Sequence, residues 1–144
     1  MEDVFHLGVK ALLRNNKGEV LLLKVNPQKL NGKGENNYWD LPGGRVQKGD
    51  SVLDTLRREV KEETGIASIS TGEEIGIVLA NIRIPISKGE SADLVLAIYT
   101  CSASDVDITL SEEHTAYQCF TPIRAAELFK VKYPEKFCKI IAAM

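Results

Sequence analysis

Apolar and polar residues alternate at the start of the chain, and this period of two predicts a β-strand. The alternating apolar positions are Phe5, Leu7, Val9, Ala11 and Leu13. Turn-forming residues at 15–18 lead into an apolar run at 20–25, so we expect the two strands to form a hairpin. Residues 26–37 are rich in Asn and show no periodicity, which predicts a mobile loop, either a plain excursion or a flap over substrate.

The strongest helix signal lies between Ser51 and Gly65. Ser51 and Asp54 resemble a capping box with Asp in place of the usual Glu, and Gly65 stands where a helix would end. Between them, apolar residues recur three and four positions apart: Leu53, Leu56 and Val60. This spacing predicts an amphipathic helix. Just before it, Gly43 and Gly44 favour a turn.

The second half of the chain predicts more strands and two helices. The runs 74–86 and 92–101 surround a turn sequence, and a change of apolar parity between Leu79 and Ile82 predicts a bulge. A short strand at 117–121 leads into Thr121-Pro122, an N-cap followed by proline, and Tyr133-Pro134 repeats that pattern. The last helix is expected to bury one face: Phe137, Ile140, Ile141 and Met144. Strands around a central helix indicate a mixed α/β fold.

Composition and charge narrow the class of protein. A chain of 144 residues and 15.9 kDa fits a single domain, 1–144. A net charge of −2 and a pI near 5.7 argue against a partner of duplex nucleic acid. Three cysteines and two histidines, with no CxxC, support neither a disulfide framework nor a zinc site. With no signal peptide and no apolar stretch that could span a membrane, we expect a cytoplasmic protein without a membrane partner; a homodimer stays open.

Candidate chemistry gathers on the predicted helix. Glu59, Glu62 and Glu63 are spaced at i, i+3 and i+4, so their carboxylates share one face and repel one another. A hard divalent cation, Mg²⁺ or Mn²⁺, would offset that repulsion. The alternative is a solvated face whose acids pair with neighbouring Arg and Lys. Arg45 follows the two glycines, whose backbone groups can face a metal or a phosphate, and we expect it to bind substrate.

These residues together resemble the Nudix box. Gly44, five residues, Asp50, seven residues and the run from Arg58 to Ile66 reproduce the family pattern Gly-x5-Glu-x7-Arg-Glu-U-x-Glu-Glu-x-Gly-U, in which U is aliphatic. Asp50 alone departs from it, because the family has Glu there. We expect Asp50 to support the start of the helix by accepting backbone N–H bonds, and the enzyme to be active as it stands.

The resemblance implies an α/β/α sandwich with a mixed sheet, in which the box forms a catalytic loop-helix-loop. It implies hydrolysis of a diphosphate linkage with Mg²⁺ or Mn²⁺ as cofactor. The implied metal ligands are the Gly43 carbonyl and three carboxylates: Glu59, Glu62 and Glu63. By the same likeness, Arg58 would hold Glu59 in place through a charge-assisted hydrogen bond. Glu59 is our first candidate for the base that takes the proton from water.

Candidates also lie outside the box. Many Nudix proteins take the base from a downstream acid, and Glu113, next to Glu112, stands at the matching place; an exposed acidic turn is the equal alternative. We expect His114 to be structural or a hydrogen-bond donor. Trp39 would stack on a base or, more commonly for a large aromatic, pack in the core. Tyr117 presents the same choice, and we expect it in the core.

The leading functional hypothesis is a Mg²⁺-dependent Nudix hydrolase that cleaves a small nucleotide, a nucleoside triphosphate as in MutT-like enzymes. The alternatives are an ADP-ribose or dinucleoside polyphosphate hydrolase, and a non-catalytic nucleotide sensor on the same fold. The intact acids of the box argue against a sensor, which would have no need of them.

Overall fold

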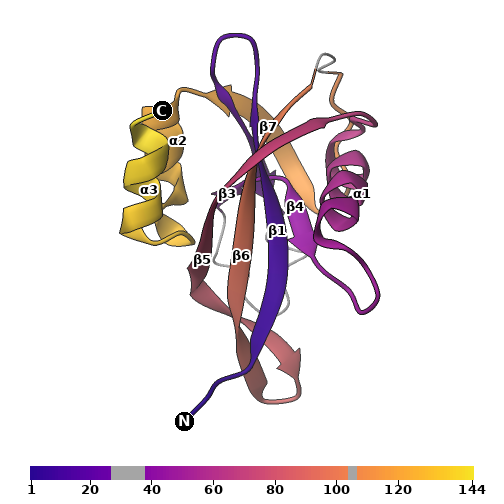
Figure 1. Cartoon of the computed structure of the whole chain (residues 1–144), viewed down its shortest axis with the longest axis vertical. Coiled ribbons are helices and arrows are strands. Elements are labelled where there is room, and N and C mark those ends of the chain that lie inside the picture. Colours follow the sequence, from indigo (N-terminus) through magenta and orange to yellow (C-terminus); the bar gives the residue numbers. More distant parts are fainter. Residues whose placement is uncertain (27–37, 104–106) are drawn as a thin grey trace.

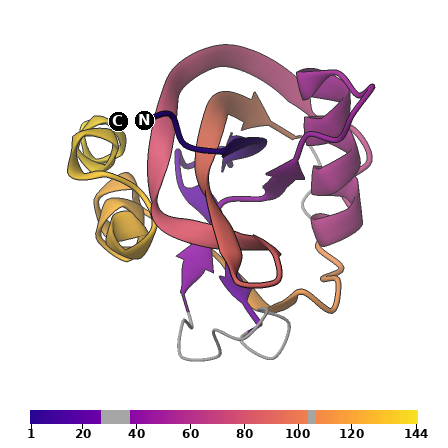
Figure 2. The ribbon, with the colours of Figure 1, turned by 90° about the horizontal axis from the view of Figure 1, so that it is seen from below.

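The computed structural model describes residues 1–26, 38–103 and 107–144. A curled mixed sheet lies between one helix on one side and two helices on the other (Figures 1 and 2). Its strands are β1 (Phe5–Arg14), β2 (Val20–Val25), β3 (Trp39–Asp40), β4 (Gly43–Arg45), β5 (Ser70–Ser87), β6 (Glu90–Ser102) and β7 (His114–Phe120). The helices are α1 (Val52–Thr64), α2 (Pro122–Leu128) and α3 (Glu135–Ala142), with a 3-10 turn, η2 (Phe129–Val131), between the last two. This arrangement confirms the α/β sandwich.

Strand β1 occupies the middle of the sheet and decides where the box lies. It pairs in parallel with β6 along its whole length, from Phe5 opposite Asp93 to Arg14 opposite Ser102. On its other edge it pairs with β2 at its last residue alone and then with β4. The predicted first hairpin is therefore confirmed at its turn, but its strands diverge, and β3 and β4 occupy the space between them.

The two glycines ahead of the helix lie in strand β4, so the predicted turn is wrong. Gly43 pairs with Lys10 and Gly44 with Val9. Gly43 has φ 148°, and a Cβ there would overlap the Val9 carbonyl oxygen, so the close approach of β4 to β1 requires glycine. This pairing fixes the backbone of the box against the central strand.

Helix α1 forms as the sequence predicts. The Ser51 hydroxyl accepts a bond from the Asp54 N–H at 3.1 Å, and Gly65 ends the helix with φ 80° while its N–H donates to the Lys61 carbonyl. Leu56 and Val60 are fully buried against the sheet and Leu53 partly so. On the opposite face, α2 and α3 cover a second core centred on Phe129, Tyr133 and Phe137. The sheet thus holds α1 from one side only, with its acidic end beside β4.

The second hairpin and its bulge are confirmed, with a register shift between Leu79 and Arg83. The predicted strand bounds are corrected, because β5 begins at Ser70 and not at residue 74, and β7 begins at His114 and not at Tyr117. Pro134, not Tyr133, occupies the N-cap position of α3. Ile140 and Met144 are exposed, because α3 lies at the margin of the molecule and buries a different set: Phe137, Cys138 and Ile141. Tyr117, expected in the core, is 48% exposed.

Two further expectations concern the loop at 26–37 and a membrane-spanning segment. Of the predicted loop at 26–37, residues 27–37 lie outside the described residues. Among the helices that the structure describes, none is long and apolar enough to cross a membrane.

Candidate active site

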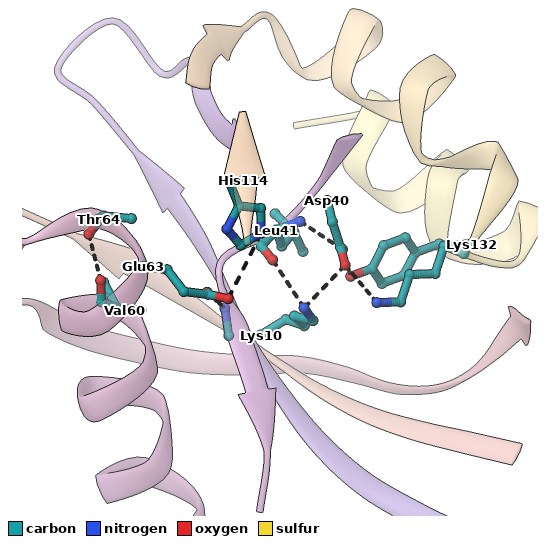
Figure 3. Close-up of polar contacts among 10 residues, drawn as sticks. Lys10, Asp40, Leu41, Val60, Glu63, Thr64, His114 and Lys132 are labelled. Carbon is teal, nitrogen blue, oxygen red and sulfur yellow. Dashed lines mark hydrogen bonds and ion pairs between the residues drawn. The ribbon is translucent and has the colours of Figure 1, made fainter. Parts of the chain in front are cut away.

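The last turn of α1 delivers Glu63 to the backbone of β4. The Gly43 N–H donates to Glu63 Oε1 at 2.8 Å. Glu63 is 5% exposed, an uncommon position for a carboxylate. Because α1 is capped at both ends and packed through Leu56 and Val60, the side chain is held in register with the strand (Figure 3).

The turn before β7 adds two more side chains to this point. One ligand atom each from Glu63, Glu113 and His114 lie within 4.8 Å of one another. His114 Nε2 is 3.9 Å from Glu63 Oε2, beyond hydrogen-bond distance. Strand β2 pairs with β7, and Val25 lies opposite His114. This pairing brings the turn that carries Glu113 and His114 to the box.

Burial shifts the pKa of two members of this group, Glu63 and His114. It raises the pKa of Glu63 to about 8, against the opposing influence of the Lys10 ammonium and the Gly43 N–H. Burial also lowers the pKa of His114 to about 4, so its ring is neutral at pH 7. His114 Nδ1 is buried and has no hydrogen-bond partner among the described residues. The group is therefore deficient in positive charge and in polar partners.

Glu59 lies beside Gly44, one turn before Glu63. A Cβ at Gly44 would overlap the Glu59 carboxylate, which explains why glycine stands there. The pKa of Glu59 is raised, first by partial burial and then by the like charge of Glu62. The Glu62 side chain is 60% exposed at the outer edge of the face. The three box acids do not together form the tight group. Among the described residues that group contains Glu63 alone of the three, with Glu113 and His114 as its other members.

The role expected of Arg58 changes in the structure. Its Nη1 donates to Asp50 Oδ2 at 3.0 Å, whereas its Nη2 lies 3.9 Å from Glu59 Oε1 and its Nε 4.0 Å from Glu62 Oε1. The hydrogen bond predicted to Glu59 is thus made to Asp50. Asp50 is not the helix cap either, because Ser51 takes that place. Asp50 instead fixes the guanidinium across the start of the helix, while Arg58 remains near both acids.

The two residues expected to bind substrate, Arg45 and Trp39, are not members of the tight group. Arg45 is exposed at the end of β4, and its Nη1 is 3.4 Å from His6 Nδ1. Trp39 packs edge-on against Phe120, with ring centroids 5.1 Å apart, and Lys24 Nζ lies 5.8 Å from its ring centroid. Trp39 therefore makes a packing contact at the sheet, which is the alternative to stacking on a base that the sequence analysis gave.

A buried charge cluster beside the site was missed in the sequence. Asp40 Oδ2 accepts from Lys10 Nζ at 3.2 Å and from Lys132 Nζ at 2.6 Å, and Oδ1 accepts from the Tyr133 hydroxyl at 2.6 Å (Figure 3). Burial alone would raise the pKa of Asp40, but the two ammonium groups hold it well below its usual range. Lys10 also donates to the Leu41 carbonyl, so the cluster ties β1, the segment leading to β4 and the C-terminal helices together.

The donors present suit a divalent cation. Glu63 and Glu113 offer carboxylate oxygens, the ligands that hard divalent ions prefer. A buried carboxylate that accepts a single backbone hydrogen bond lacks the compensation its charge needs, and a cation would supply it. The group can therefore hold a metal ion beside Glu59 and β4.

Comparisons with known proteins agree with this geometry. The family model described as the NUDIX domain matches residues 4–138, and the chain belongs to the Nudix family. It is 30% identical over 115 residues to the nucleoside triphosphatase NudI of Klebsiella pneumoniae, an alignment that covers 78% of this chain and 79% of that protein.

Solved structures share the fold over nearly the whole chain. A MutT protein from Methanosarcina mazei is 28% identical with a TM-score of 0.72, covering 98% of this chain and 93% of that one. An Ap4A hydrolase from C. elegans, 19% identical, has a TM-score of 0.65 and covers 94% and 92%. The protein is thus a Nudix hydrolase, an enzyme that acts on phosphoric anhydrides.

Proposed function

We propose that this chain is a Mg²⁺- or Mn²⁺-dependent hydrolase that cleaves a diphosphate linkage of a nucleoside triphosphate and releases pyrophosphate. The observation that carries the proposal is the convergence of Glu63, Glu113 and His114 on one point beside the box backbone. The name of the NudI relative, aligned over most of both chains, supports a triphosphate as substrate.

The chain's own residues divide the work. Glu59, Glu63 and Glu113, together with the Gly43 carbonyl, would hold the cation, with Glu62 reaching it through water from the exposed edge. When bound, the metal lowers the pKa of an attacking water and neutralises charge on the phosphate oxygens. Arg58, fixed by Asp50, adds positive charge next to Glu59 and Glu62.

A carboxylate must take the proton from the attacking water, and the two candidates are Glu59 and Glu113. Glu59 is partly buried and has a raised pKa, which suits a base better than a fully solvated acid. Glu113 is exposed but belongs to the tight group with Glu63. We assign Glu59 as the base and Glu113 as a metal ligand, and Arg45 as a contact for the substrate phosphates.

A panel of substrates tests the function. The purified chain is incubated with Mg²⁺ and each ribo- and deoxyribonucleoside triphosphate, ADP-ribose and a dinucleoside polyphosphate, and the released phosphate and pyrophosphate are measured. We expect pyrophosphate from at least one triphosphate at a rate well above that from the other classes. Cleavage of ADP-ribose or the dinucleotide alone would replace the substrate assignment, and binding without cleavage would indicate a sensor.

Variants of the acids test the roles. Glu59→Gln should abolish turnover while metal still binds through the remaining ligands, Glu63, Glu113 and the Gly43 carbonyl. Glu113→Gln should weaken metal binding and turnover together, whereas Glu112→Gln, its matched neighbour, should leave both near the parental values. A Glu59→Gln variant with parental turnover would overturn the assignment of the base.

A further inference from the structure

His114 places a buried imidazole ring beside the acids of the tight group. Its side chain is 7% exposed, and among the described residues Nδ1 has no partner while Nε2 reaches no closer than 3.9 Å to Glu63 Oε2. Buried polar atoms are ordinarily hydrogen-bonded, so the unpartnered Nδ1 shows that hydrogen bonds to the described residues do not hold this ring beside the acids. Nε2, which faces Glu63, is the nitrogen positioned to meet an ion held by those acids.

The spacing around Nε2 is that of ligands sharing one ion. Metal–oxygen and metal–nitrogen bonds of about 2.0–2.2 Å put two ligands of one ion roughly 3–4.4 Å apart, according to the angle between them. The 3.9 Å between His114 Nε2 and Glu63 Oε2 falls in this range, and it is too long for a hydrogen bond. Glu113 closes the triangle, with all three ligand atoms inside 4.8 Å.

We propose that His114 Nε2 is a direct ligand of the catalytic cation, and that this nitrogen makes the site prefer Mn²⁺ to Mg²⁺. The inference rests on the proposed metal dependence and deepens it. Mg²⁺ selects oxygen ligands and retains its waters. Mn²⁺ shares the preference for carboxylate oxygen but, as a first-row transition ion, gains more from an imidazole nitrogen than Mg²⁺ does.

Metal titration of the full chain without substrate tests the preference. Mn²⁺ and Mg²⁺ affinities are measured calorimetrically for the parent and for His114→Gln. The control is His6→Gln, because the second histidine is half-buried and lies outside the group. We expect the parent to bind Mn²⁺ at least tenfold more tightly than Mg²⁺. His114→Gln should weaken Mn²⁺ binding at least tenfold and Mg²⁺ binding less than threefold, while His6→Gln changes neither.

Pulsed EPR of the Mn²⁺-loaded parent gives an answer even where the variant folds poorly. A directly bound imidazole shows hyperfine coupling from ¹⁴N, and His6→Gln should retain that coupling. Its absence, or equal losses of Mn²⁺ and Mg²⁺ affinity in His114→Gln, would overturn the proposal and leave the hydrolase function intact. A parent that binds neither metal would instead count against the proposed function itself.

Discussion

Replacing Asp40 by Asn should destabilise the protein more than any other single charge removal among the residues described. The variant keeps the shape of the side chain but leaves two buried ammonium groups, Lys10 and Lys132, without their shared counter-charge. Removing one partner of a buried ion pair costs about 3–5 kcal/mol, a large part of the roughly 5–15 kcal/mol that holds a typical domain together. The Tyr133 hydroxyl loses a charge-assisted bond of 2.6 Å as well.

Urea unfolding at pH 7, followed by circular dichroism and by the fluorescence of the single tryptophan, measures this loss. Asp54→Asn is the matched control, because Asp54 is 78% exposed and pairs with Arg57 at 3.5 Å, so its loss should cost less than about 1 kcal/mol. Adding Lys132→Met to Asp40→Asn should restore part of the stability, since one uncompensated charge is then removed. A loss below about 1 kcal/mol in Asp40→Asn would show that the two ammonium groups do not depend on the Asp40 carboxylate.

The same cluster gives a pH dependence of known sign. The folded-state pKa of Asp40 is depressed, so its contribution is present above the unfolded pKa of about 3.9 and is lost as the pH falls below it. The parent should therefore lose stability on acidification below about pH 4 more steeply than Asp40→Asn. Equal acid slopes for the two proteins would contradict the assignment of a buried, ionised Asp40.

Three further outcomes follow from the box. Burial raises the pKa of Glu63 from 4.5 to about 8, so in EDTA the folded chain binds a proton that the unfolded chain has lost between these values. The stability of the parent should therefore fall as the pH rises through that range. Glu63→Gln should remove this pH dependence and, at pH 8, melt no lower than the parent. Gly44→Ala should reduce turnover by at least tenfold because its Cβ displaces Glu59, whereas Gly76→Ala, where a Cβ meets no atom within 4 Å, should leave turnover unchanged. Asp50→Glu should change turnover less than tenfold, under about 1.4 kcal/mol of barrier, because Arg58 keeps a carboxylate partner; a gain of several hundredfold would contradict this.

Local signals in the sequence were sufficient for the helix that carries the box. Ser51, Gly65 and the stripe of Leu56 and Val60 act within a few residues of one another, so caps and periodicity define α1 without knowledge of the rest of the fold. The spacing of the box acids likewise follows from helix geometry alone.

What the sequence could not reveal depends on contacts between distant segments. Lys10, Asp40 and Lys132 lie 30 and 92 positions apart, and a lysine inside an apolar strand pattern looks like an exposed position until its partners are known. The Arg58–Asp50 bond crosses the loop before the helix, and no local pattern encodes it. Ile140 fails as a core residue because amphipathic spacing identifies a face but not whether another element covers it.

The proposed function makes the buried group around Glu63 essential for hydrolysis of a nucleoside triphosphate with a bound divalent cation. The most direct measurement is the initial rate of pyrophosphate release at saturating triphosphate and Mn²⁺, for the parent, Glu63→Gln and the exposed-site control Glu135→Gln. We expect turnover in the parent and the control, and a loss of at least a thousandfold in Glu63→Gln, equal to about 4 kcal/mol of barrier, with the fold intact. A folded Glu63→Gln variant that releases pyrophosphate at the parental rate would contradict it.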